Sequence, residues 1–141
     1  MLSRGAQRQT GVNMNLSIPP TRLWKANDAA PNPGGAYVLY WMTSARRTND
    51  NYGLQHALQW ATRLNRPLLV LEALRCDYLW VSARFHRFIL DGMADNRRAL
   101  RMKGVRYFGY VEPSPGHGKG LLEALASEAC VVVTDHFPCF F

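Results

Sequence analysis

The sequence lacks the features that would fix its class at once. No apolar run approaches the roughly 18 residues of a membrane span, and the N-terminus lacks the apolar centre of a secretory signal. The three cysteines, Cys76, Cys130 and Cys139, form no CxxC pair and no metal-ligand spacing. We therefore expect three reduced thiols, with Cys130 buried in its apolar run, and a cytoplasmic protein that does not enter membranes.

Nucleotide-binding and catalytic motifs are also absent. Gly116-His-Gly-Lys-Gly precedes a helical pattern, but a phosphate-binding loop needs Gly where Pro113 stands and Ser or Thr where Gly120 stands. No G-x-G-x-x-G follows the first strand pattern, and no serine lies in a nucleophile elbow. The four histidines have no mutual metal spacing. The sequence thus gives no catalytic residue and no metal site.

The composition is that of a folded basic domain. The chain has 141 residues, 48% of them hydrophobic, which allows one domain with a real core and excludes wholesale disorder. Its formal net charge of +7 favours an acidic partner, nucleic acid first and an anionic membrane second. Because the charges are scattered, a solvated basic surface is the alternative. The N-terminus has no acidic residue before Asp28, as in a transit peptide or a disordered tail.

Four short apolar runs alternate with three helical patterns. The runs span residues 37–42, 68–72, 105–111 and 130–134, and the helical patterns span 52–64, 83–103 and about 121–129. Strands that are apolar at nearly every position are covered on both faces, which is typical of a parallel sheet between helix layers. We predict an α/β fold with an open, mainly parallel Rossmann-like sheet, right-handed crossovers and helices on both faces.

The pattern begins only after a long polar segment. Residues 1–35 show no period, so we expect a disordered or loosely docked N-terminal arm, held through Leu23 and Trp24 where it docks. Residues 36–141 form the predicted α/β domain. The sequence closes on Phe140 and Phe141, an apolar stretch that we interpret as a truncation before the end of that domain.

The best ligand candidate is the loop after the first strand. Ligands of open α/β sheets bind beyond the carboxyl ends of the strands where the strand order reverses, and we expect that reversal at the strand 37–42. Trp41 and Met42 offer a flat and a soft apolar wall there, and Arg47 and Asn51 offer hydrogen-bond donors near a helix N-terminus. Glu72 ends the next strand. The predicted binding residues are Trp41, Met42, Ser44, Arg47, Asn51 and Glu72. The alternative is that these are ordinary core and surface-turn residues.

Several segments, taken in order, resemble a known family. They are Tyr-Val-Leu-Tyr-Trp-Met at 37–42, then Arg47, Asn51 and Leu54, Asn-Arg-Pro-Leu-Leu-Val at 65–70, Arg-Phe-His-Arg-Phe at 84–88 and Val-Val-Val-Thr-Asp at 131–135. In order and spacing they resemble the N-terminal α/β domain of the DNA photolyase/cryptochrome family, closest to the class II type. The resemblance covers about residues 36–135.

The resemblance implies a function for a longer protein. Photolyases are carbon–carbon lyases that use light to split pyrimidine dimers in DNA. Their reduced FAD and the flipped dimer bind a C-terminal helical domain, which is missing here, so this chain alone is not expected to be catalytic. The α/β domain can hold an antenna chromophore, a deazaflavin or a folate. We expect DNA as the partner of the full-length protein, and a monomer.

Two segments depart from the family pattern. Thr43-Ser-Ala-Arg46 replaces a typical Gln-Ala-Ser-Gln, and His136-Phe-Pro-Cys-Phe-Phe replaces a usual Arg-Gly-Tyr. They indicate a divergent branch and leave open whether the antenna pocket is kept. The alternative function is a stand-alone nucleotide- or cofactor-binding α/β module of the universal-stress type.

Overall fold

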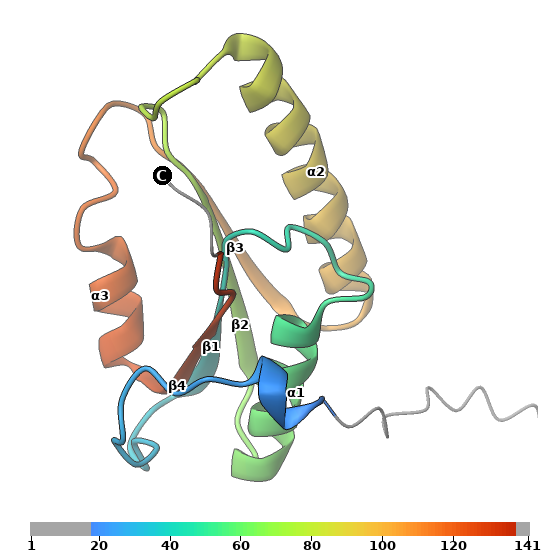
Figure 1. Ribbon diagram of the computed structural model, residues 1–141, viewed down its shortest axis with the longest axis vertical. Helices are drawn as coiled ribbons and strands as arrows, with labels where there is room; N and C mark the ends of the chain where they lie inside the picture. Colours follow the sequence, from blue (N-terminus) through green and yellow to red (C-terminus); the bar gives the residue numbers. More distant parts are fainter. Residues whose placement is uncertain (1–17, 138–141) are drawn as a thin grey trace, which may run out of the picture.

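The computed structural model describes residues 18–137. Residues 1–17, about half of the predicted arm, and residues 138–141, with Cys139, Phe140 and Phe141, lie outside the described residues. The elements follow in the order η1 (Pro20–Arg22), β1 (Tyr37–Met42), α1 (Tyr52–Leu64), β2 (Leu68–Leu74), α2 (Ala83–Met102), β3 (Arg106–Val111), α3 (Leu121–Ser127) and β4 (Ala129–Thr134). Figure 1 shows their arrangement.

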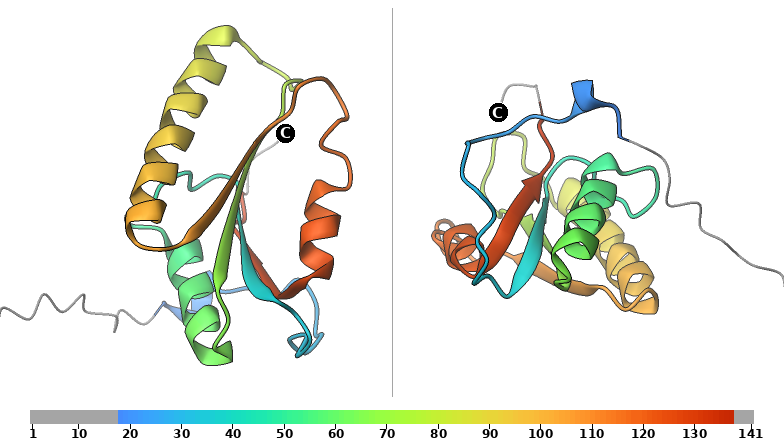
Figure 2. Two further views of the ribbon diagram at one scale, coloured as in Figure 1. Left: turned by 180° about the vertical axis from the view of Figure 1, so that it is seen from behind. Right: turned by 90° about the horizontal axis from the view of Figure 1, so that it is seen from below.

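The four described strands form one parallel sheet in the order β3-β2-β1-β4. Helices α1 and α2 lie on one face and α3 lies on the other (Figure 2). The predicted open α/β sheet with helices on both faces is thereby confirmed. The strand order reverses at β1, as predicted, because β2 and β4 flank it on its two sides.

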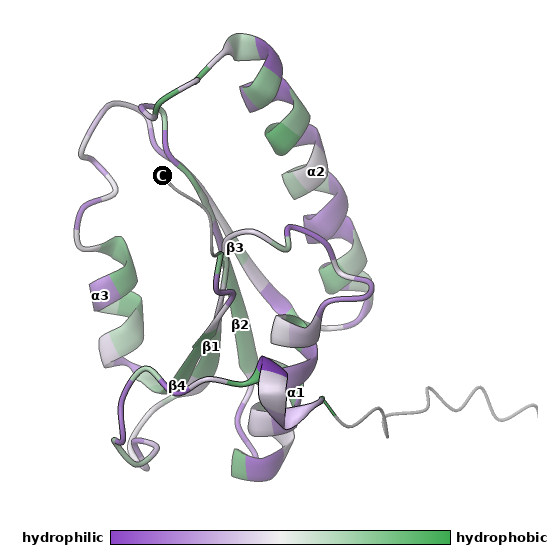
Figure 3. Ribbon diagram, in the orientation of Figure 1, coloured by the Kyte–Doolittle hydropathy of each residue, from purple (hydrophilic) through white to green (hydrophobic). Residues whose placement is uncertain are grey.

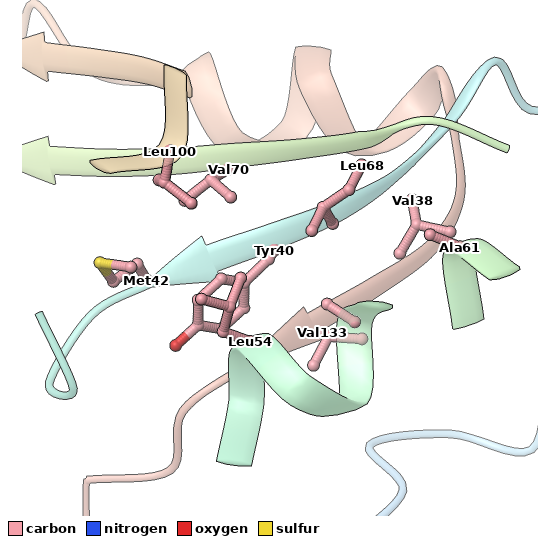
Figure 4. Close-up of a cluster of buried hydrophobic side chains, with 10 residues drawn as sticks. Val38, Tyr40, Met42, Leu54, Ala61, Leu68, Val70, Leu100 and Val133 are labelled. Atoms are coloured by element: carbon pink, nitrogen blue, oxygen red, sulfur yellow. The ribbon is translucent and has the colours of Figure 1, made fainter. Parts of the chain in front are cut away.

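The main core fills the face under α1 and α2. Val38, Tyr40 and Met42 of β1 point to this face and have no exposed surface, and Leu54 and Leu100 pack onto them from α1 and α2 (Figure 4). Residues at alternate positions of β1 point to the other face, where Leu39 packs against α3. A strand apolar at every position therefore supplies both cores at once.

Local signals in the sequence fix the helix ends. Asn51 caps α1 by accepting a hydrogen bond from the Leu54 N–H at 2.9 Å, and Ser82 caps α2 through the Phe85 N–H at 3.2 Å. Asn65 ends α1 in the left-handed conformation with φ 50°, just before Pro67. These caps explain why the predicted helix starts are correct.

Two predicted boundaries differ from the structure by two residues, and three others differ by one residue. Strand β2 continues two residues past Glu72, because Ala73 and Leu74 pair with the end of β3. The last helix ends at Ser127, and Ala129 already belongs to β4, where it pairs with Tyr37. In both cases pairing with a distant strand decides the boundary, and local periodicity does not show it.

The described end of the arm contacts β4, α1 and the segment after β4: the Trp24 ring lies 6.1 Å from the His136 ring, and the Arg22 guanidinium lies 4.9 Å from the centroid of the Tyr52 ring. Ile18 is buried, whereas Leu23 and Trp24 are exposed. The backbone at Asn32 bonds to that of Cys130 at 2.9 Å. Gly35 lies so close to the β4 backbone that a Cβ atom there would clash with it. The arm therefore contacts the domain through both its backbone and the side chains of Ile18, Arg22 and Trp24.

The predicted buried thiol is confirmed: Cys130 is buried, and its Sγ–H donates to the Gly35 carbonyl. Within residues 18–137, no helix is both long enough and apolar enough to cross a membrane.

Candidate functional site

The strand order reverses between β1 and β4, and the crevice at this point is closed by Asp135. This residue directly follows β4, and its carboxylate accepts hydrogen bonds from the Thr43 N–H (3.1 Å), the Ala45 N–H (3.2 Å) and the Tyr40 hydroxyl (2.8 Å). Gly53 makes the close approach of α1 possible, since a Cβ atom there would lie 2.6 Å from Asp135 Oδ1. The usual ligand crevice is thus filled by the protein's own carboxylate.

Asn51 fastens the same loop from the side of α1. Besides capping α1, its side-chain amide donates to the Ala45 and Arg47 carbonyls, both at 2.9 Å, and pairs with the Tyr40 hydroxyl. Burial raises the pKa of the Tyr40 phenol, and the Asp135 carboxylate raises it further, so the hydroxyl stays protonated. The β1–α1 loop is therefore held in one conformation.

On the α1/α2 side, the carboxyl ends of β1 and β2 surround the buried carboxylate of Glu72. It accepts hydrogen bonds from Arg46 (3.2 Å), Asn96 (3.0 Å) and the Tyr107 hydroxyl (2.8 Å). Glu72 has no exposed surface, while the Arg46 side chain is 28% exposed. Burial and the Glu72 charge both raise the pKa of the Tyr107 phenol. This network joins the β1–α1 loop, β2, α2 and β3 and leaves the Glu72 charge paired.

On the α3 side, the carboxyl edge is open. A cavity of about 340 Å³ lies between the strand ends, the loop after β3 and the start of α3. Its walls are mainly apolar: Trp41, Leu71, Tyr110 and Leu122 contribute to them. Space of this size beside aromatic side chains fits a flat ring system.

Two cations border this cavity. Arg75 follows β2 and Lys119 precedes α3. Within residues 18–137 neither side chain has a hydrogen-bond or ion-pair partner. An apolar slot with two unpaired cations at its border suits a flat molecule that carries a negative charge.

The glycine-rich loop beside the cavity binds the carboxylate of Glu112. Glu112 accepts hydrogen bonds from the N–H groups of Gly116 (3.0 Å), Gly118 (3.1 Å) and Cys76 (3.1 Å). These N–H groups lower the pKa of the Glu112 carboxyl, and burial together with Glu112 raises the pKa of the Cys76 thiol. The loop N–H groups that would bind a phosphate therefore already donate hydrogen bonds to Glu112.

The structure does not bring the six predicted binding residues around one cavity. Trp41 faces α3 and borders the cavity, whereas its neighbour Met42 faces the other core and is fully buried. Asn51 and Glu72 are buried in the two hydrogen-bond networks described above. Ser44 and Arg47 are exposed, and the Arg47 guanidinium donates to the Asp50 carbonyl.

Sequence reasoning missed the residues that complete the edge. Successive side chains of a strand point to opposite faces of the sheet, so Trp41 and Met42 cannot line the same cavity. The sequence alone carries this signal. Asp135, a carboxylate directly after a buried strand next to β1, was a second available signal. Arg75, Tyr110 and Lys119 carry no motif, and only the fold brings them beside Trp41. Within residues 18–137 no three His, Cys, Asp or Glu side chains gather to hold a metal ion.

Comparison with known proteins identifies the family. The chain is similar to a deoxyribodipyrimidine photo-lyase of Methanothermobacter thermautotrophicus, 32% identical over 118 residues, which cover 84% of this chain and 26% of that protein. It is also similar to a deoxyribodipyrimidine photo-lyase of Arabidopsis thaliana, 33% identical over 100 residues, which cover 66% of this chain and 19% of that protein. No family model matches the chain. The chain spans about a quarter or less of these curated relatives, and over that span it belongs to the DNA photolyase family.

Proposed function

We propose that this chain is the α/β domain of a deoxyribodipyrimidine photo-lyase-like protein. In its full-length form that protein uses light to open pyrimidine dimers in DNA. The observation that carries the proposal is the similarity to two photo-lyases over 84% and 66% of the chain. The open parallel sheet, reversing at β1, is the fold that the resemblance implies. The class II type and a cytoplasmic location are parts of the same proposal.

The chemistry belongs to residues that this chain does not contain. In the family, FAD and the dimer bind a helical domain, and about three quarters of the Methanothermobacter relative lies outside the match. We therefore propose that this chain by itself repairs nothing and serves the full-length protein as a scaffold and chromophore holder.

The α3-side cavity is the proposed antenna site. A deazaflavin or a folate would place its ring between Trp41, Leu71 and Leu122, and Arg75 and Lys119 would meet its negatively charged groups. Of the six residues in the sequence prediction, this position keeps Trp41. Met42, Asn51 and Glu72 then support the edge from the opposite side and do not contact the ring.

The universal-stress type of nucleotide-binding module has less support. Such a module needs a loop whose N–H groups are free for phosphate, and the Gly116 and Gly118 N–H groups bind Glu112. The crevice between β1 and β4 is also filled by Asp135. No observation on this chain favours the module over the photolyase domain.

The function is tested with a chimera of the Methanothermobacter photo-lyase, in which this chain's matched segment replaces that protein's own. Light-dependent repair of irradiated DNA is measured for the chimera, for the relative itself and for this chain alone. We expect repair by the first two and none by the third. Repair by this chain alone would overturn the proposal, as would a folded, flavin-loaded chimera without light-dependent repair.

DNA binding by this chain alone is expected to be weak. The net charge of +7 provides phosphate contacts but no lesion pocket, so affinity should fall with salt and not distinguish irradiated from unirradiated duplexes. Titration of both duplexes at two salt concentrations measures this. A clear preference for irradiated DNA would contradict it.

A further inference from the structure

A cluster of large apolar side chains is exposed where α2 begins. Leu79, Trp80, Val81, Phe85 and Phe88 are exposed by 74%, 79%, 41%, 58% and 77%. We call these five residues the α2 patch. Scattered exposed apolar residues are common, but five large ones within ten positions mark an interaction surface.

The patch exists because α2 extends beyond the sheet. The buried residues of α2 are Met93, Asn96 and Leu100, all in its second half. The ten residues before Met93 correspond to about 15 Å of helix, and Figure 1 shows this part rising past the carboxyl ends of the strands. Apolar green alternates with hydrophilic purple along it, and green also appears in the segment before it (Figure 3). Within residues 18–137 His86 and Ile89 of this half are partly buried, whereas Phe85 and Phe88 stay exposed.

The patch is nevertheless held in a defined conformation. The Val81 N–H donates to the Tyr78 carbonyl at 3.1 Å, and the Tyr78 ring packs against His86 with the ring centroids 5.6 Å apart. Trp80 has φ 71°, a left-handed conformation that costs a bulky residue about 1 kcal/mol or more. An exposed tryptophan with a strained backbone, in a turn that other contacts hold in place, indicates a surface that binds a partner.

The chemistry of the patch favours a protein surface over nucleic acid. Arg87 is paired with Asp91 at 3.0 Å, which leaves Arg84 as the other cation among residues 79–91. Nucleic-acid binding draws its affinity from several unpaired cations against phosphates, and this segment does not offer them. Five uncharged, mostly aromatic or branched side chains are instead the composition of a buried interface centre.

We propose that the α2 patch is the docking surface for the part of the photolyase polypeptide outside the α/β domain. This inference rests on the proposed function. About three quarters of the Methanothermobacter relative has no counterpart in the match and is available to cover the patch. The patch begins at Leu79, only four residues after Arg75 at the border of the cavity. The docked part therefore sits beside the proposed antenna site.

The test is co-purification of this chain, carrying a tag, with the remainder of the Methanothermobacter photo-lyase, expressed together. We expect the tagged chain to recover the remainder, and Trp80→Lys with Phe88→Lys to lower the recovery about tenfold or more, as for residues at an interface centre. Trp24→Lys is the matched control, because Trp24 is exposed by 80% but lies outside the patch. Thermal unfolding of the double variant should equal that of the parent, since the patch contributes nothing to this fold.

Hydrogen exchange and sedimentation test the same docking surface independently. Amide hydrogen exchange at residues 79–88 should be slower in the chimera than in this chain alone, and equal exchange would overturn the proposal. Recovery of the remainder by the double variant as well as by the parent would overturn it too. Sedimentation should show a monomeric chain, whereas a dimer abolished by the double variant would assign the patch to a second copy. Docking without light-dependent repair would refute the proposed function alone.

Discussion

The carboxyl edge of the sheet has two sides that differ in kind. On the α1/α2 side, the buried Glu72 carboxylate accepts hydrogen bonds from three different elements. On the α3 side, an apolar cavity of about 340 Å³ has two unpaired cations at its border. Most of the polar residues that the sequence predicted for the site lie on the α1/α2 side. In the proposed assignment, buried polar residues support the site from one side, and less conspicuous residues line it from the other.

Removing the Glu72 carboxylate should have the largest effect on stability. Glu72→Ala leaves Arg46, Asn96 and Tyr107 without their shared acceptor, and breaking a buried charged network by removing one partner costs about 3–5 kcal/mol. Denaturant unfolding measures the loss. Glu123→Ala is the control, since Glu123 is exposed on α3. A loss below about 1 kcal/mol for Glu72→Ala would show that the network does not stabilise the fold.

Tyr40→Phe should have a smaller effect on the same side. The substitution removes a buried hydroxyl that joins Asn51 and Asp135, but both partners keep other hydrogen bonds. We expect a loss of about 1 kcal/mol in the free energy of unfolding. If unfolding is unchanged while amide exchange in the β1–α1 loop speeds up, the hydroxyl orders the loop without stabilising the fold.

On the open side, removing the cations should affect binding and not folding. Arg75→Ala with Lys119→Ala should weaken binding of a deazaflavin or a reduced folate several-fold, because exposed charges contribute about 0.2–1 kcal/mol each. The melting temperature should stay the same, since neither side chain has a partner within residues 18–137. A fall in melting temperature would mean that Arg75 and Lys119 stabilise the fold.

The pH dependence of stability should contain a contribution from Glu112. Its pKa is lower in the folded chain than in the unfolded chain, so its stabilisation is present above the unfolded value of about 4.3 and is lost as pH falls through the folded value. Glu112→Gln should remove this part of the acid destabilisation. Unfolding curves below about pH 5 measure it, and identical pH profiles for the two proteins would contradict it.

The sequence predicted the fold well because the relevant forces are local. Apolar runs bounded by Pro67 or capped by Asn51 and Ser82 mark elements whose ends depend on neighbouring residues. The cavity depends instead on which strands become neighbours. Tyr110 and Lys119 reach Trp41 only through the pairing of β3 with β2 and of β2 with β1. The resemblance supplied the family, and the comparisons agree with it.

We propose that a flat chromophore binds on the α3 side and that the polar residues of the other side only support it. Ala73 borders the cavity, so Ala73→Phe fills it, whereas Arg47 is exposed away from it. Tryptophan fluorescence is followed during titration with a deazaflavin and with a reduced folate. We predict binding by the parent and by Arg47→Ala, and a loss of about tenfold or more in affinity for Ala73→Phe. Unchanged affinity of Ala73→Phe, or no binding by the parent, would contradict the claim.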